Sequence, residues 1–182
     1  MNFQWYTNIL TNELEQGDFL EKCPIIIPPE LIEEGSQPEV EVEYIDSIIL
    51  SQSCDLVNEK LEIVLVCPYY SLQTFLDSLP EGQKPTTIKS KKKIIEELKK
   101  GQSPGYHLLN KDSEYSIKDY IVVDFKNVYG VHFLFLKEFV KKFNNGNRIR
   151  LLPPYREHLS QAFARYFMRV GLPQDIIIEG YY

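Results

Sequence analysis

Two hydrophobic segments separated by a short turn constrain the fold of this chain most strongly. Residues 39–51, EVEVEYIDSIILS, alternate acidic and apolar side chains before they become a continuous apolar run, and residues 62–68, EIVLVCP, follow after a turn. Alternation with a period of two is typical of a half-exposed strand, and a short apolar run indicates a buried one. We therefore predict two strands whose apolar positions form the core, namely Ile48, Ile49, Leu50, Val64, Leu65 and Val66.

The hydrophobic period changes after the second strand. Residues 70–79 and 90–101 have helical spacing on either side of PEGQKP, and Gly101 is a C-cap signal. Other patterns predict a short helix at 135–143 and strands at 16–27, 106–109, 120–125, 129–135 and 148–152. This order predicts a single α+β domain over residues 1–182. We expect a small bent β-barrel with a helical insertion at about 69–101 and a C-terminal helix at about 154–170.

Composition excludes several classes of protein. A chain of 182 residues with 43% hydrophobic and 13% aromatic side chains can bury a packed core. The first residues lack the basic lead and apolar centre of a signal peptide, and no apolar run reaches the roughly 20 residues that span a bilayer. The three cysteines form no CxxC pair. We expect a cytoplasmic protein with reduced thiols, without a membrane partner, a metal or a cofactor.

The net charge of −6 conceals a division along the chain. Residues 1–60 hold 13 acidic side chains against two lysines, whereas residues 61–182 hold 13 acidic against 18 basic ones. If the two regions lie on separate faces, the basic region would attract nucleic acid or an acidic protein surface. If they fold against each other, their charges neutralise. The sequence leaves both interpretations open.

All five arginines fall between residues 148 and 169, on a predicted strand and the helix that follows it. Arginine offers a permanent charge and a planar fork of donors that suits phosphate or carboxylate. On the helix, Leu159, Phe163, Tyr166 and Val170 form the predicted core face, and three basic side chains form a stripe along its flank. The candidate binding residues are Arg148, Arg150, Arg156, His158, Arg165 and Arg169. In the alternative interpretation, Arg165 and Arg169 pair with the acidic N-terminal region, at Asp18 or Asp55.

The segment SQSCDL is a second candidate site. Cys54 and Asp55 lie at the end of the first predicted strand, at a bend that could present a nucleophile. A reactive thiolate there needs a histidine partner from among His107, His132 and His158. The candidate catalytic residues are Cys54, Asp55, His107 and His158.

A structural interpretation of the same segment competes with the catalytic one. In it, Ser51 and Ser53 bond the turn backbone, Asp55 caps the turn, and Cys54 is a small core residue. A metal site built from Cys54, Asp55, His107 or Asp124 is not expected, because no pair of these residues has the spacing that ligand geometry requires.

The segments GDFLEKCP and IDSIILSQSCDLVNEKLEIVLVCPY resemble the opening of the MazF/PemK family of SH3-like barrels. In that family a Gly-Asp strand start precedes an apolar strand that ends in Leu-Ser and a second strand that ends in Cys-Pro or a similar pair. The matching positions are Gly17, Asp18, Leu50, Ser51, Cys67 and Pro68. SQSCDL and PPYREHLSQAFARYFMRVGLP are in addition similar to segments of a bacterial family to which no established activity is attached.

The chain departs from the MazF/PemK pattern at the positions that carry the chemistry. The family has an Arg-Pro pair that serves cleavage of single-stranded RNA, but Ile45 and Asp46 stand here. Tyr69 and Tyr70 stand where the family places its catalytic threonine, although Ser71 is near. A ribonuclease needs positive charge at the developing phosphorane and a group that moves protons. The inherited reaction is therefore not expected.

The sequence favours a noncatalytic binding module in a bacterial nucleic-acid-related system of the toxin–antitoxin or phage-defence type, an assignment that rests on the resemblance. The alternatives are a ribonuclease or a cysteine-dependent hydrolase with a rearranged active site, and a docking subunit of a larger complex. The expected partners are nucleic acid or an acidic protein surface, with a homodimer or a larger protein assembly as the expected quaternary state.

Overall fold

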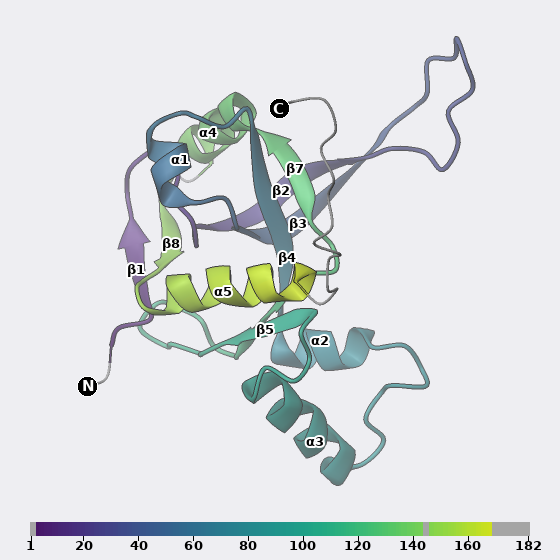
Figure 1. Ribbon diagram of the computed structural model, residues 1–182, viewed down its shortest axis with the longest axis vertical. Coiled ribbons are helices and arrows are strands. Elements are labelled where there is room, and N and C mark those ends of the chain that lie inside the picture. Colours follow the sequence, from purple (N-terminus) through teal and green to yellow (C-terminus); the bar gives the residue numbers. More distant parts are fainter. Residues whose placement is uncertain (1–2, 144–145, 169–182) are drawn as a thin grey trace, which may run out of the picture.

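The computed structural model describes residues 3–143 and 146–168 and shows an α+β protein (Figure 1). The strands of this part are β1 Tyr6–Ile9, β2 Phe19–Ile27, β3 Glu41–Ile49, β4 Ile63–Ser71, β5 Tyr106–Leu109, β6 Ile121–Asp124, β7 Tyr129–His132 and β8 Arg148–Leu151. The helices are α1 Ser53–Val57, α2 Leu72–Ser78, α3 Ile88–Lys99, α4 Phe133–Lys142 and α5 Tyr155–Phe167. The predicted α+β class is confirmed.

The other strands are arranged around β4. It pairs with β7 through residues 63–66, with β3 through residues 66–68 and with β6 through residues 69–71, in each case antiparallel. The larger sheet has the order β2-β3-β4-β6-β5, with β7 also on β4, and β1 and β8 form a separate pair. A bridge between Asp18 and Arg150 joins that pair to the start of β2. The strands of the described residues do not close into a barrel.

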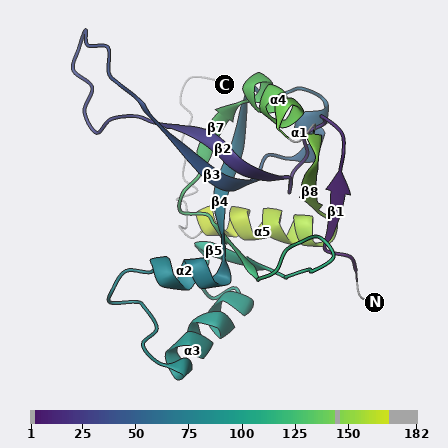
Figure 2. The same ribbon diagram turned by 180° about the vertical axis from the view of Figure 1, so that it is seen from behind.

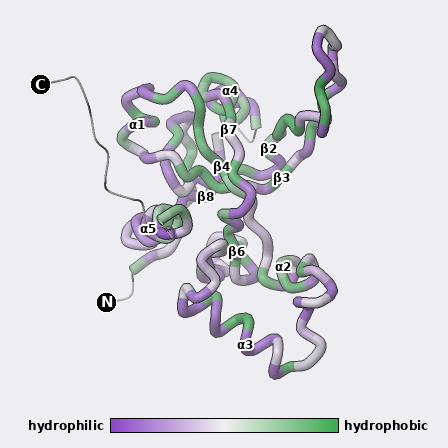
Figure 3. The backbone as a smooth tube through the Cα atoms, turned by 45° about the vertical axis from the view of Figure 1, so that its right-hand side comes forward, coloured by the Kyte–Doolittle hydropathy of each residue, from purple (hydrophilic) through white to green (hydrophobic). Residues whose placement is uncertain are grey.

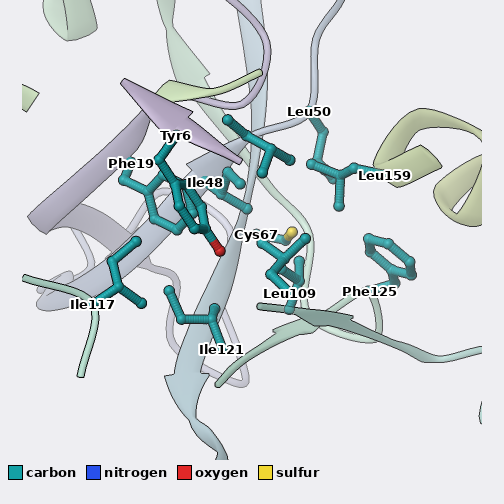
Figure 4. Packing of buried hydrophobic residues seen from close by; sticks show 12 residues of the cluster. Tyr6, Phe19, Ile48, Leu50, Cys67, Leu109, Ile117, Ile121, Phe125 and Leu159 are labelled. Carbon is teal, nitrogen blue, oxygen red and sulfur yellow. The ribbon is translucent and has the colours of Figure 1, made fainter. Parts of the chain in front are cut away.

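The buried side chains of the described residues gather in three clusters. The first lies between β1, β8, α5 and the middle of the larger sheet, and includes Tyr6, Ile48, Cys67 and Leu159 (Figure 4). The second packs α1 and α4 against β2, β3, β4 and β7. The third packs α2 and α3 against β5 and β6. The predicted helical insertion therefore shares its core with the sheet.

Five of the six predicted core residues are buried, and the prediction for Leu65 is wrong. Val64 and Val66 are fully buried, whereas the side chain between them is 38% exposed. Successive side chains of a strand point to opposite faces, and only one face of β4 packs on the core here. Its backbone nevertheless contributes, because the Leu65 carbonyl accepts a bond from Leu50 N–H at 2.9 Å.

The helical segment starts later than predicted, because β4 runs to Ser71. The hydroxyl of Ser71 caps α2 by accepting a bond from Thr74 N–H at 3.0 Å. Thr87 caps α3 in a reciprocal arrangement with Ser90, which fixes the start of that helix. The C-terminal helix begins one residue after its predicted start, and residues 169–170 of its predicted range lie outside the described residues.

Two elements project from the body. We define the hairpin arm as residues 24–44. It contains the last residues of β2, the first residues of β3 and the loop between them, and it extends away from the body of the molecule (Figures 1 and 2). Helices α2 and α3 extend from the other end of the molecule (Figure 2). Among the described residues, no helix combines the length and the apolar character needed to cross a membrane.

Candidate functional site

Arg148 and Arg150 of β8 are held inside the molecule by one carboxylate. Arg148 Nε donates to Asp18 Oδ2 at 2.7 Å, and Arg150 donates to both oxygens of Asp18, through Nη2 at 3.1 Å and through Nε. Asp18 is fully buried, and the two arginines are 8% and 7% exposed. Their other donors bond the backbone carbonyls of Thr11, Glu13 and Gly146, except Arg150 Nη1, which donates to the Glu15 carboxylate. This burial argues against both arginines as partner-binding residues.

The Gly-Asp pair places the carboxylate at this position. Gly17 adopts a φ of +84°, and a Cβ added there would lie 3.0 Å from Leu151 Cβ. Gly17 N–H donates to the Ile49 carbonyl and its own carbonyl accepts from Leu151 N–H, each at 2.9 Å. Only glycine reaches this conformation at little cost while the backbone of β8 passes so close. The turn therefore joins β3 to β8 and directs Asp18 toward both arginines.

Arg156, in the first turn of α5, extends this group of arginines toward solvent. We define the arginine cluster as Arg148, Arg150 and Arg156. Its Nη1 donates to Glu15 Oε2 at 3.0 Å, and Glu15 also pairs with Arg150. Pairing with the acidic N-terminal region, which was the alternative interpretation for Arg165 and Arg169, occurs instead at Arg148, Arg150 and Arg156. It does not occur at Arg165, which forms no ion pair among the described residues. Arg169 lies outside the described residues.

A basic groove lies where the C-terminal end of α3 meets β5 and α5. The cavity has a volume of about 280 Å³ and no acidic side chain among the described residues that line it. We define the basic groove by the charged and imidazole side chains of this lining, which are Lys99, Lys100, His107, His158 and Arg165. The small Ala162 lies between the two residues of the predicted α5 stripe, and Leu159 on the same helix is fully buried. The groove therefore unites His158 and Arg165 as the helical spacing predicted.

His107 forms the partly buried wall of the groove. Its ring stacks on Phe125 with the centroids 6.2 Å apart, while the exposed His158 makes an edge contact with Tyr155. Burial, together with the positive charge of nearby His158, lowers the pKa of His107 from 6.5 to about 4. The ring is therefore neutral at pH 7, and the fixed positive charge of the groove comes from its lysines and arginine.

Lys126 adds a further cation beside the groove. Its Nζ lies 4.5 Å from the centroid of the Tyr106 ring, and Tyr106 itself lines the cavity. Bonding to Tyr106 is the main cause that raises the pKa of Lys126. Gly105 makes room for the lysine, because an added Cβ would lie 2.9 Å from Lys126 Cε. The groove thus combines cationic groups with an aromatic face.

SQSCDL forms the entry to helix α1 and its first residues, and its thiol is exposed. Ser51 Oγ accepts a bond from Leu65 N–H at 2.8 Å, and Ser53 Oγ accepts one from Gln16 N–H at 3.1 Å. Asp55 closes the turn through its backbone, whose carbonyl accepts from Lys60 N–H at 2.9 Å. Cys54 is exposed, so the expectation that it is a core residue is wrong.

The candidate histidines contact other parts of the molecule. In the described part of the chain, no hydrogen bond or ring contact joins the SQSCDL segment to His107 or His158. The third histidine faces a glutamate, with His132 Nε2 3.8 Å from Glu62 Oε1. Nor does any cluster of three or more His, Cys, Asp or Glu side chains suit a metal ion there. The geometry does not assemble the cysteine-dependent site that we considered from the sequence.

Sequence reasoning missed two features. Lys99 and Lys100 come from a helix more than fifty residues before α5, so only the packing of α3 on β5 brings them to the groove. A larger cavity of about 610 Å³ lies between β2, β4 and α4, with Glu21 and Asp46 beside aromatic rings. Burial and these two carboxylates raise the pKa of Tyr69 in its wall. Its lining holds three carboxylates against Lys118 and Arg148, and Arg148 is already paired with Asp18, so this second cavity suits phosphate less well than the basic groove.

Comparisons with protein-family models, with curated proteins and with solved structures gave no match. The role of the basic groove is therefore argued from its charge and geometry. The groove combines three fixed positive charges with an adjacent aromatic ring, and no carboxylate lines it among the described residues.

Proposed function

We propose that this protein is a noncatalytic binding module whose basic groove holds the phosphate backbone of single-stranded nucleic acid. The observation that carries the proposal is the convergence of Lys99, Lys100 and Arg165 on a cavity without an acidic lining residue among those described. Phosphate contacts from lysine and arginine supply most of the affinity of nonspecific nucleic-acid binding. The Tyr106 ring offers a face on which a base can stack, as in other single-strand binding proteins.

The wider setting of this proposal comes from the resemblance to the MazF/PemK family. We place the module in a bacterial toxin–antitoxin or phage-defence system and regard its bent sheet as a version of the SH3-type barrel. The pairing of β4 supports this. Its first residues pair with β7 and β3 and its last three with β6, as a strand does where it passes from one sheet to another at a corner. Fold alone does not determine function, so the proposed binding depends on the chemistry of the groove.

The absence of catalysis is part of the proposal. Ile45 and Asp46 stand where the family has Arg-Pro, and Asp46 instead accepts a bond from Lys22 N–H at 2.9 Å, which stabilises the irregular pairing of β2 with β3. A carboxylate there would repel a scissile phosphate. We expect incubation with mixed-sequence single-stranded RNA to leave the RNA intact. Metal-independent cleavage that survives purification and is lost on His107→Gln would contradict this part of the proposal.

Binding is tested by fluorescence anisotropy with a labelled 20-nucleotide RNA of mixed sequence. Removal of all three cations in Lys99→Ala/Lys100→Ala/Arg165→Ala should weaken binding by about tenfold or more, since each lost phosphate contact lowers affinity. The matched control removes three lysines from the other end of α3, in Lys89→Ala/Lys92→Ala/Lys93→Ala, and should have a smaller effect.

Two results would contradict the proposal. Equal losses in the groove variant and the control would show that only net charge matters. Binding of a polyglutamate chain in preference to RNA, with the same dependence on the groove residues, would assign the groove to an acidic protein surface instead.

A further inference from the structure

The hairpin arm carries an apolar face that nothing in the described chain covers. Its cross-strand register places Pro24 opposite Tyr44 and Ile26 opposite Val42, so these four side chains share one face of the ribbon. Ile26, Val42 and Tyr44 are 66%, 45% and 69% exposed. The opposite face packs into the second core cluster, where Ile25 is 3% exposed. An exposed apolar patch of this kind marks an interaction surface.

The arm is also the most acidic part of the molecule. No lysine or arginine occurs between Lys22 and Lys60, and the arm contains six glutamates, namely Glu30, Glu33, Glu34, Glu39, Glu41 and Glu43. None of the six forms an ion pair with another described residue. Contact between two such arms would place like charges together, which is unfavourable. The apolar face therefore fits a basic surface.

The start of α3 is a basic surface on the same chain. Lys89, Lys91, Lys92 and Lys93 lie within its first six residues, beside Ile88, whose side chain is 78% exposed. Lysines at a helix N-terminus oppose the helix dipole, so helix stability does not explain them. Lys89 and Lys92 form no ion pair among the described residues. The N-terminus of α3 and its lysines together favour an acidic neighbour.

These two surfaces project from opposite ends of the molecule, so the arm does not cover α3 of its own chain (Figure 3). We propose that two copies of this chain associate by placing the hairpin arm of each against the start of α3 of the other. The four apolar side chains meet Ile88 and the aliphatic stems of the lysines, while the glutamates pair with the lysine heads. One such contact is small beside the roughly 1,200 Å² that stable interfaces bury, and a two-fold arrangement forms it twice.

The test is sedimentation velocity of the full chain over a range of concentrations. The wild-type protein should form a dimer that dissociates as salt rises from 0.05 to 0.5 M, because the pairing charges are exposed. Two charge-reversed variants are prepared, Glu39→Lys/Glu41→Lys on the arm and Lys89→Glu/Lys92→Glu on α3. Each alone places like charges in both contacts and should raise the dimer dissociation constant by about tenfold or more.

Mixing the two variants supplies the decisive measurement. In a mixed dimer the lysines of one arm meet the glutamates of one α3, and the two unchanged surfaces meet each other, so association should return to the wild-type level. Lys99→Glu/Lys100→Glu is the matched control, because these residues lie about 15 Å further along the helix and should not affect the dimer.

Three outcomes would overturn the proposal. A wild-type protein that stays monomeric at every concentration and low salt would exclude self-association. A mixture of the two variants that remains monomeric would show that the arm and α3 do not meet each other. Equal disruption by the control at Lys99 and Lys100 would place the contact elsewhere. Thermal melting of each variant distinguishes loss of association from loss of fold.

Discussion

Arginine and lysine are used in opposite ways in the arginine cluster and in the basic groove. In the cluster, Arg148 and Arg150 are buried, and Asp18 accepts bonds from both. In the groove, Lys99, Lys100 and Arg165 face a cavity without a described acidic lining residue. The same residue types therefore stabilise the fold in one place and remain available to a partner in the other. The difference is set by whether the fold supplies a carboxylate.

The charge state of the buried basic groups also depends on whether a carboxylate is near. Bonding and charge from Asp18 raise the pKa of Arg150 against the opposing effect of its burial, so it stays charged inside the molecule. His107 is also withdrawn from water, but it has a second histidine as its neighbour and its pKa falls to about 4. Burial costs a charged group its hydration, and only a paired charge recovers that free energy.

The largest expected effect comes from removing the shared carboxylate. Asp18→Asn keeps the shape of the side chain but leaves the buried Arg148 without a counter-charge and Arg150 with only the partly exposed Glu15, so the free energy of unfolding should fall by about 3–5 kcal/mol. Urea denaturation measures this directly. The control is Glu157→Gln, which removes an exposed partner of Arg156 at 3.4 Å and should cost less than about 1 kcal/mol. Similar losses in both variants would show that the cluster is no more important than a surface pair.

The second prediction concerns pH and the neutral histidine. The folded pKa of His107 is about 4 and the ordinary value is 6.5, so between these pH values the unfolded chain binds a proton that the folded chain does not. Stability should therefore fall as pH drops through this window, by roughly 3 kcal/mol from this group alone. Comparing denaturation of wild type and His107→Phe at pH 7, 6 and 5 isolates the contribution.

Removing the neighbouring histidine tests what lowers the pKa of His107. His158→Gln eliminates the smaller cause of the lowered pKa, so the fall in stability between pH 6.5 and 4 should become less steep. An identical pH profile for wild type and His107→Phe would contradict the burial of a neutral imidazole in this wall.

The third prediction tests the boundary between the two regions at Arg156. This side chain is 21% exposed and bonds Glu15, while its stem packs where Gly17 leaves space. Arg156→Ala should lower the free energy of unfolding by about 1 kcal/mol, because Glu15 keeps its pairing with Arg150 and is not left without a partner. Arg156→Lys should restore part of this by charge alone. A fall in the free energy of unfolding as large as that of Asp18→Asn would show that Arg156 on α5 matters as much to stability as the buried arginines.

The sequence was informative wherever a feature depends on neighbouring residues. The strands 39–51 and 62–68 and the C-terminal helix follow from hydrophobic period, and the grouping of His158 with Arg165 follows from helical spacing. Leu65 was misplaced because an apolar run does not tell which of its alternate side chains faces the core.

Long-range packing was the part that the sequence could not supply. Asp18 and the arginines of β8 are about 130 residues apart, and only the antiparallel contact through Gly17 brings them together. Lys99 and Lys100 reach the groove because Leu98 is buried under β5 and β6, a contact that no local pattern encodes. The composition gave the charges, but the tertiary fold decided which of them neutralise each other.

The smallest effect on stability is expected at Arg165, where the groove and the cluster differ most. Arg165→Ala should change the free energy of unfolding by less than about 0.5 kcal/mol, because the side chain is exposed and no described carboxylate pairs with it. Its effect should appear in RNA binding, where the slope of log affinity against log salt should decrease in magnitude by about 0.7 for one lost phosphate contact. Arg165→Lys should preserve that slope, since a lysine still neutralises the phosphate. A marked loss of stability with an unchanged salt slope would move Arg165 from the groove to the structural arginines, and the contrast between the two regions would then fail.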